Sequence, residues 1–251
     1  MKVLQINAVC GIKSTGRICT DIADVLLEEG HDCKIIYGRE CIPSKYKKIA
    51  IKIGNKWDVY AHIIYTRLTG KTGLGSKNAT KKVIKEIKKY NPDIIHIHNL
   101  HGYYINIEEL FRYIKEYNKP VLWTLHDCWA FTGQCTHFEH INCFKWKSGC
   151  QHCNQTHCYP KSLFMDNSKY NYHMKKDLFC SVENMKIITP SKWLSNHVRN
   201  SFLNKYDLSV IPNGIDLQLF KPIKSDIKKV YGIENKKVIL GVASSDRKSV
   251  V

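Results

Sequence analysis

Short, continuous apolar runs alternate with stretches of helical periodicity along most of this chain. The first run covers residues 2–6, a helical pattern over 17–29 follows it, and the same order repeats up to the run 208–211. Runs without polar alternation are typical of strands buried on both faces, and parallel strands need a crossover between them. The sequence therefore predicts an α/β fold: a Rossmann-like, doubly wound parallel sheet with helices on both faces.

The bounds of the expected elements come from the same pattern. Gly30 stands where a C′ glycine would end the first helix. The apolar runs predict further strands at 33–37, 48–53, 93–98, 121–125 and 186–189. The helical patterns predict further helices at 56–68, 77–90, 107–117, 169–179 and 191–202.

The pattern changes after residue 215. Residues 213–216 (NGID) predict a turn, 223–231 a lysine-rich helix, and 237–242 (KVILGV) the first strand of another α/β unit. A lone strand cannot bury its apolar faces. We therefore expect a first domain over 1–215 with a cysteine-rich insertion at 126–160, a linker over 216–236, and only the start of a second domain at 237–251.

Composition excludes several classes of protein. Hydrophobic residues make up 43% of the 251 residues, which is enough to build a core and argues against disorder. No apolar run approaches the ~20 residues that span a bilayer, and residues 1–10 do not resemble a secretion signal. We therefore expect a cytoplasmic protein. The net charge of +17 predicts attraction to nucleic acid, anionic lipid or phosphorylated small molecules.

The cysteines cluster in the expected insertion. Cys150 and Cys153 have the spacing of a metal knuckle, and Cys135 and Cys143 precede them at moderate distance. In a reducing compartment such a cluster favours metal or free thiols over disulfides. Four thiols can hold a tetrahedral structural zinc ion, which would stabilise an insertion without strong hydrophobic periodicity. Packed free thiols and disulfides are the alternatives.

Ligands of doubly wound sheets bind beyond the carboxyl ends of the strands, so the residues that follow each strand are candidate site residues. The first such place is 10–17 (CGIKSTGR), where Gly11 and Gly16 lead into a helix N-terminus that, with Arg17, can hold an anionic group. The glycine spacing is not that of a dinucleotide site. A purely structural turn is the alternative.

Two further strand ends carry polar side chains. His96 and His98 share a face of the strand at 93–98, and a hydrogen-bonded wall of a polar cleft is favoured over a metal site, because the segment offers no evident third ligand. His126 and Asp127 leave the sheet where a substrate would lie, which predicts a hydrogen-bonding or acid–base role. Asp127 as a loop cap is the alternative.

Five segments in this order resemble glycosyltransferase family 4. They are the glycine-containing loop after the first strand, 93–102 (DIIHIHNLHG), 123–135 (WTLHDCWAFTGQC), 189–194 (TPSKWL) and 211–216 (IPNGID). The cysteine-rich insertion resembles a bacterial subgroup of cell-surface polysaccharide synthesis. The resemblance implies a GT-B architecture, in which the N-terminal domain binds the acceptor and the C-terminal domain the nucleotide sugar. It also implies retaining transfer without an essential metal or cofactor.

The resemblance also implies roles for single residues. Gly11 and Gly16 belong to the loop that approaches the donor diphosphate and the acceptor, and His126 would hydrogen-bond the transferred sugar. Arg247 and Lys248 match a basic pair that neutralises the leaving diphosphate as the glycosidic bond breaks. The remaining residues expected to bind donor or acceptor are Arg17, His98, Asn99, Asp127 and Asn213.

The chain departs from the family pattern after the basic pair. Ser249 stands where the family has glycine, the sequence ends at Val251, and the glutamate pair of the donor domain is missing. We therefore expect this polypeptide to have little or no transferase activity by itself.

The favoured function is transfer of a sugar from a UDP- or GDP-linked donor to a lipid-linked or polysaccharide acceptor. The basic charge favours a peripheral position on the inner face of the plasma membrane, where each Lys or Arg gains about 1 kcal/mol from an anionic leaflet.

Two other functions are less consistent with the pattern. The alternative is a basic zinc-knuckle protein that binds nucleic acid through the lysines of 77–90. Those lysines surround Val83, Ile84 and Ile87 and are typical of the polar face of an amphipathic helix, so we expect no nucleic-acid partner. The missing glycine fingerprint disfavours a nicotinamide oxidoreductase.

Overall fold

The computed structural model describes residues 1–239. The chain divides into two compact units, Met1–Asn213 and Gly214–Val251. The expected boundary of the first domain was residue 215. In the second unit the helix expected at 223–231 is shorter, because α7 covers only Ile227–Val230. The strand expected at 237–242 lies largely outside the described residues.

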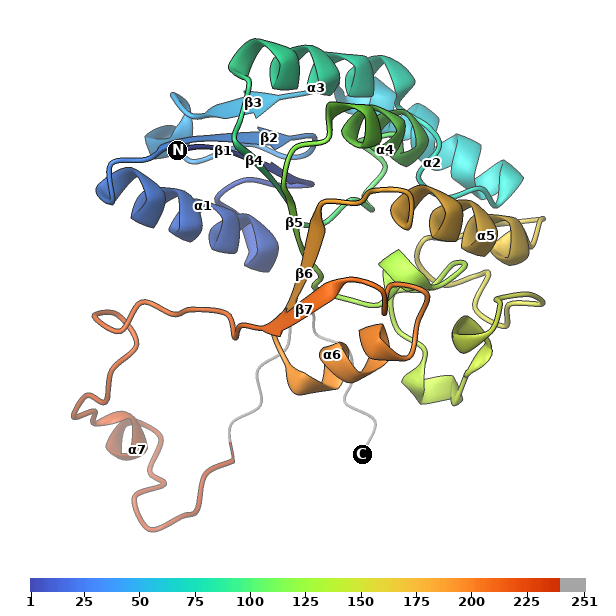
Figure 1. Cartoon of the computed structure of the whole chain (residues 1–251). Helices are drawn as coiled ribbons and strands as arrows, with labels where there is room; N and C mark the ends of the chain where they lie inside the picture. Colours follow the sequence, from blue (N-terminus) through green and yellow to red (C-terminus); the bar gives the residue numbers. More distant parts are fainter. Residues whose placement is uncertain (240–251) are drawn as a thin grey trace. The chain divides into compact units, whose positions relative to one another are not determined.

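Seven parallel strands form the sheet of the first unit, in the order β3-β2-β1-β4-β5-β6-β7 (Figure 1). The order reverses between β1 and β4, and ligands of doubly wound sheets bind beyond the strand ends at such a reversal. The predicted doubly wound parallel sheet is confirmed. The strands are β1 (Lys2–Asn7), β2 (Asp32–Tyr37), β3 (Ala50–Lys52), β4 (Ile94–Ile97), β5 (Val121–Thr124), β6 (Met185–Thr189) and β7 (Asp207–Val210).

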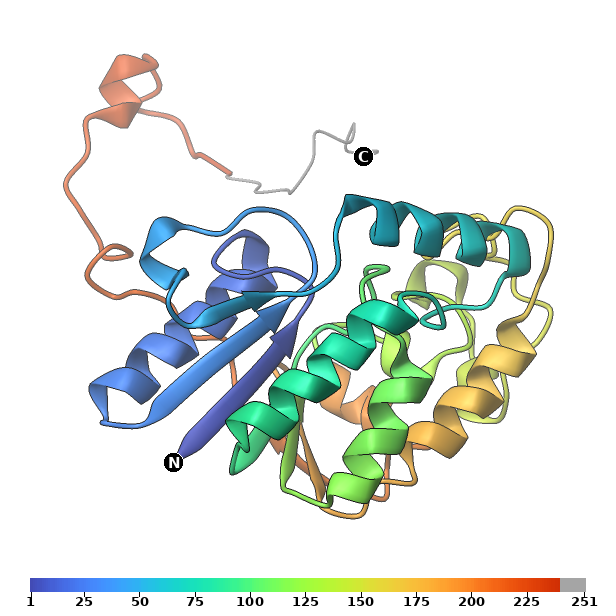
Figure 2. The same cartoon turned by 90° about the horizontal axis from the view of Figure 1, so that it is seen from above.

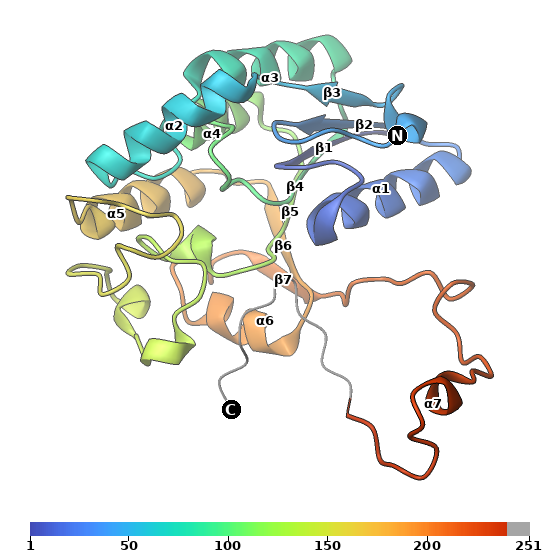
Figure 3. The ribbon, with the colours of Figure 1, turned by 180° about the vertical axis from the view of Figure 1, so that it is seen from behind.

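Helices cover both faces of this sheet. Helix α1 packs against β1 and β2 on one face, and α3, α4 and α5 lie side by side on the other (Figures 2 and 3). Aromatic rings join the second layer to the sheet, because Phe111 of α4 and Phe179 of α5 both contact Trp123 of β5. The helices are α1 (Lys13–Glu28), α2 (Lys56–Thr69), α3 (Lys77–Tyr90), α4 (Ile107–Tyr117), α5 (Ser168–Phe179) and α6 (Lys192–Arg199).

Two predicted helix bounds are wrong for identifiable reasons. Helix α1 begins four residues earlier than expected, since Gly16 lies inside its first turns, where a Cβ would lie 3.1 Å from Val9 Cγ2. Because Gly16 has no side chain, helix α1 and the loop after β1 can approach each other closely. Helix α6 ends three residues early, because the Ser201 hydroxyl donates to the Val198 carbonyl and accepts from the Leu203 amide, which turns the chain.

The predicted amphipathic helix at 77–90 is confirmed. Val83 and Ile87 of α3 are fully buried, so the lysines between them form the solvent face.

The insertion between β5 and α5 contains three short 3₁₀ turns and no longer regular element. It has a small aromatic core of its own. The Phe138 and Trp146 rings stack with centroids 4.9 Å apart, and the Phe131 ring lies 5.4 Å from that of Trp146. Packing of aromatic side chains, rather than hydrogen bonding between strands, therefore stabilises this segment.

A buried histidine joins α2 to the start of α3. The Gly75 amide donates to His62 Nε2 at 3.1 Å, so the ring proton lies on Nδ1 and is donated to the Ser76 hydroxyl at 2.9 Å. Burial lowers the pKa of His62 from 6.5 to about 4.

This shift predicts a pH dependence of stability. Between pH 6.5 and about 4 the unfolded chain binds a proton at His62 that the folded chain excludes, so the free energy of unfolding falls as the pH falls through this window. The contribution of His62 reaches about 3 kcal/mol at the acid end. Urea denaturation across the window should give a flatter profile for His62→Gln than for the unmodified chain. His31→Gln, at a partly exposed loop histidine, is the control. Parallel profiles for the His62 variant and the unmodified chain would contradict the assignment.

Candidate functional site

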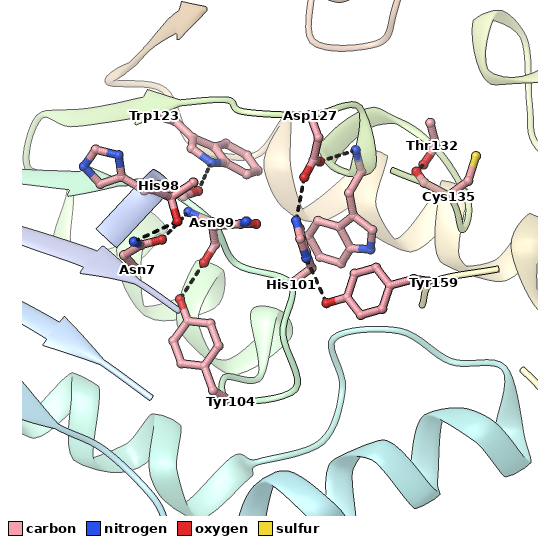
Figure 4. Close-up of polar contacts among 12 residues, drawn as sticks. Asn7, His98, Asn99, His101, Tyr104, Trp123, Asp127, Thr132, Cys135 and Tyr159 are labelled. Atoms are coloured by element: carbon pink, nitrogen blue, oxygen red, sulfur yellow. Dashed lines mark hydrogen bonds and ion pairs between the residues drawn. The ribbon is translucent and has the colours of Figure 1, made fainter. Parts of the chain in front are cut away.

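The candidate site lies at the carboxyl edge of the sheet, around the reversal between β1 and β4 (Figure 4). The loops that follow β1, β4 and β5 meet here, because Ile6 of β1 pairs with Ile97 of β4, and Ile97 pairs with Trp123 of β5. This register places the expected residues His98 and His126 next to one another.

A chain of hydrogen bonds crosses three strands at this edge. Gln5 Nε2 donates to the Cys19 carbonyl at 2.8 Å, which fixes the orientation of the amide and turns Gln5 Oε1 toward His98 Nε2 at 3.0 Å. His98 therefore carries its proton on Nε2, and its Nδ1 accepts from His126 Nε2 at 3.3 Å. A neutral His126 ring that carries its proton on Nε2 has an unprotonated Nδ1, which is a hydrogen-bond acceptor. We call Gln5, His98 and His126 the histidine relay.

The relay is electrically neutral at neutral pH. Burial lowers the pKa of His98 well below its usual value, and the neighbouring His96 and His126 lower it further. Burial also lowers the pKa of His126. His96 packs beside His98 and hydrogen-bonds the Thr124 hydroxyl at 2.9 Å, with a pKa lowered to about 4, chiefly by burial. These uncharged histidines are therefore suited to form hydrogen bonds with a ligand rather than an ion pair.

A second polar pair lies beside the relay. His101 Nε2 donates to Asp127 Oδ2 at 2.6 Å, and the Tyr159 hydroxyl contacts His101 Nδ1 at 2.9 Å (Figure 4). Burial raises the pKa of Asp127, but the charge and hydrogen bond of His101 and the Trp129 amide outweigh it and hold the pKa below its usual value. Asp127 also caps the following turn, since its Oδ1 accepts from the Trp129 amide at 2.8 Å.

His126 and Asp127 thus point to different partners and form no dyad. His126 contacts His98, whereas Asp127 contacts His101. This separation follows from the alternation of side chains along an extended segment.

The loop after β4 is fixed by its own hydrogen bonds. The Asn99 amide donates to Asn7 Oδ1 at 3.2 Å, and the Tyr104 hydroxyl donates to the Asn99 carbonyl at 2.8 Å. Trp123 Nε1 donates to the His98 carbonyl at 3.0 Å, so β5 also holds this loop. The residues around His98 are therefore preorganised.

The loop after β1 brings Gly11, Gly16 and Arg17 to the same edge. Gly11 has a left-handed φ of +69°, and its amide donates to the Gly16 carbonyl at 2.9 Å. A Cβ on Gly11 would lie 2.8 Å from Pro43 Cδ, so close packing accounts for this glycine. Arg17 is exposed on the first turns of α1. The anion-binding role of these residues stays a prediction.

One expected residue lies elsewhere, and two are outside the described residues. Asn213 is exposed beyond β7, at the junction of the two compact units and several strands away from β4. Arg247 and Lys248 lie outside the described residues. The roles expected for these three residues stay predictions.

The four cysteines of the expected zinc site line one small cavity of about 20 Å³. Burial, with a smaller contribution from neighbouring thiols, raises the pKa of Cys135 to about 12 and that of Cys150 to about 11. Within residues 1–239, no three Cys, His, Asp or Glu side chains are already arranged to hold a metal ion. The zinc site therefore stays a prediction.

A further cavity borders this edge. It measures about 360 Å³ and lies between the ends of β2 and β3 and helix α2, with Arg39, Lys52 and Lys56 among its lining residues. Arg39 Nη1 donates to the Gly102 carbonyl at 3.4 Å, which joins the cavity to the loop after β4.

Sequence reasoning did not assign roles to three residues of the site: Gln5, His101 and Tyr159. A buried hydrogen bond of Gln5 was predictable from the sequence, because a polar residue inside the apolar run 2–6 needs a buried partner. No sequence pattern indicates a role for Tyr159, since its contact with His101 depends on how the insertion folds.

None of the helices within residues 1–239 combines the length and hydropathy that crossing a membrane requires.

A family model identifies the family of this chain. The family model for Glycosyltransferase Family 4 matches residues 15–219. A protein of Escherichia coli (strain K12), described as putative colanic acid biosynthesis glycosyl transferase WcaC, is 27% identical over 97% of this chain and 61% of its own length. The chain thus spans about three fifths of that relative.

Two solved structures resemble this chain in fold. Anabaena HepE, in complex with UDP and glucose, has a TM-score of 0.45 and 14% identity over 92% of this chain and 49% of its own. Phytolacca americana UGT2, complexed with UDP-2-fluoro-glucose and pterostilbene, has a TM-score of 0.45 and 10% identity. The match covers 91% of this chain and 56% of the UGT2 chain.

The family match leaves the alternative of a nucleic-acid-binding zinc-knuckle protein without support. It spans strands β2 to β7, His98 and His126 of the histidine relay, and the cysteine-rich insertion. The chain belongs to glycosyltransferase family 4.

Proposed function

We propose that this chain binds the acceptor in a retaining glycosyltransferase of cell-surface polysaccharide synthesis. The enzyme would transfer a sugar from a UDP- or GDP-linked donor to a lipid-linked or polysaccharide acceptor. The observation that carries the proposal is the neutral histidine relay at the strand-order reversal, in a chain of this family. The description of the Escherichia coli relative supports the biosynthetic context.

His126 is proposed to accept a hydrogen bond from a hydroxyl group of the transferred sugar. The relay holds its Nε2 proton toward His98, so Nδ1 is the atom that presents a lone pair to the ligand. A neutral His126 ring with a fixed tautomer can orient the sugar, and the ring does not have to change its tautomer during the reaction. Neutralisation of the leaving diphosphate is assigned to Arg247 and Lys248, as the resemblance implies, and this assignment needs no catalytic metal or cofactor.

The basic cavity beside β2 and β3 is proposed to hold an anionic part of the acceptor. Arg39, Lys52 and Lys56 border a space of about 360 Å³, large enough for a phosphate or diphosphate group together with part of a sugar. Its position beside Gly102 would direct the acceptor toward the loop after β4.

Helix α2 is proposed to contact an anionic membrane. Trp57 is 80% exposed, and Tyr60, Ile64 and Leu68 continue the same face of the helix at intervals of three or four residues. Phe164, which is 79% exposed, lies near the end of this helix, where the Leu163 amide donates to the Arg67 carbonyl. Aromatic and aliphatic side chains beside basic ones are typical of helices that lie in a membrane interface.

The proposed contact of His126 with the transferred sugar predicts that His126→Ala weakens binding of the nucleotide-sugar donor. Loss of one hydrogen bond and its supporting relay should raise the dissociation constant about tenfold. Isothermal titration with UDP- and GDP-linked sugars measures this constant. His31→Ala is the control, because His31 precedes β2 at the opposite edge of the sheet. Equal affinities for the His126 variant and the unmodified chain would refute the role of His126.

The membrane contact predicts co-sedimentation with vesicles that contain anionic phospholipid. Binding should weaken as salt is added, and it should weaken at least about tenfold in the double variant Trp57→Ser with Ile64→Ser, which removes apolar area from the proposed contact. Val25→Ser, at an exposed apolar residue of α1, is the control. Identical binding of the double variant and the control would exclude α2 as the contact.

A further inference from the structure

The cysteines of the insertion converge although the chain there has no strands or long helices. Cys135, Cys143, Cys150 and Cys153 come from successive turns and loops, yet all four line the same cavity of about 20 Å³. A space of this size can hold a metal ion and little else. The other exposed cysteine of the insertion, Cys158, does not line the cavity.

Burial raises the pKa of the Cys153 thiol, and one backbone hydrogen bond opposes this effect. The Gln155 amide, two residues beyond the Cys-x-x-Cys pair, donates to Cys153 Sγ at 3.4 Å. Hydrogen bonds from backbone amides favour the thiolate form of sulfur, which is the form that binds metal.

A fully buried lysine lies next to the cluster. Lys175 of α5 has 0% exposure, donates to the Trp129 carbonyl at 2.6 Å and lies 4.1 Å from the centre of the Trp129 ring. Both of these partners are uncharged. Cys150 and Cys135 are the groups whose negative charge would stabilise the ammonium most. Burial lowers the pKa of Lys175 to about 7, and nearby negative charge would favour its charged form, so Lys175 is placed to balance negative charge at this site.

We propose that Cys135, Cys143, Cys150 and Cys153 bind one structural zinc ion and that Lys175 balances the charge of the resulting site. Each thiol gives its proton to the solvent as its sulfur binds, so the four-thiolate site carries a formal charge of about −2. Within the described residues the side chains do not yet surround a common point, so binding requires the thiols to rotate toward the cavity that they line.

The zinc ion would hold the insertion against the candidate site. Lys175 bonds the Trp129 carbonyl, and the Trp129 amide bonds Asp127, so the metal site and the His101–Asp127 pair share one short segment of chain. The ion has no part in sugar transfer and goes beyond the proposed function.

Elemental analysis of the 251-residue chain, purified without chelator, tests the proposal. We expect one zinc per chain, and replacement by Co²⁺ should give the visible and near-ultraviolet bands of tetrahedral cobalt bound to thiolates. A folded chain with less than about a tenth of a zinc per molecule and no such cobalt bands would overturn the proposal. So would disulfides between these cysteines, detected by thiol titration of the denatured chain.

Variants locate the ion. Cys150→Ser should lose zinc, whereas Cys158→Ser should retain it in full. Lys175→Met, which keeps the length of the side chain, should lower zinc affinity at least about tenfold in a competition with a chromophoric chelator. Full zinc content in Cys150→Ser would overturn the assigned ligands, and unchanged affinity in Lys175→Met would overturn the charge-balancing role. The cobalt bands of the unmodified chain decide the proposal even if Cys150→Ser does not fold.

Discussion

The reversal of strand order between β1 and β4 is the constraint on which the candidate site depends. It places the end of β1, with Gln5 buried in it, directly beside the end of β4. Gln5 then has to satisfy its amide inside the sheet, and it does so with the Cys19 carbonyl on one side and His98 on the other. The protonation pattern of His98 and His126 follows from this single buried amide. A polar group inside the core thus determines which atom the edge of the sheet presents to a ligand.

Much of the fold could be predicted from the sequence, because periodicity and local turn chemistry agree over long segments. Helices α3 and α4 have the predicted bounds, and each ends at an asparagine in the left-handed conformation. The start of α1 could not be predicted, since Gly16 resembles a loop residue until its contact with Val9 is known. The end of α6 depends on hydrogen bonds of Ser201 that no pattern of apolar residues encodes.

The candidate site was predictable in its place but not in its connections. The strand-end rule identifies His98, His126 and Asp127 as candidates, but their partners are set by the register across β1, β4 and β5. The relay joins Gln5 to His98, which are 93 positions apart in the sequence. The His101–Asp127 pair and its contact with Tyr159 likewise require the folded insertion. The insertion therefore contributes to the site as well as to the packing around it.

The tautomer of His126 tests the central claim most directly. Nitrogen-15 NMR of the imidazole rings distinguishes Nδ1-protonated, Nε2-protonated and charged histidine. At neutral pH the relay predicts that His98 and His126 are both neutral and protonated on Nε2, because Gln5 fixes the first ring and the first ring fixes the second. Addition of a UDP- or GDP-linked sugar should shift the resonance of His126 Nδ1. A charged ring, or a proton on Nδ1 of His126, would contradict the account.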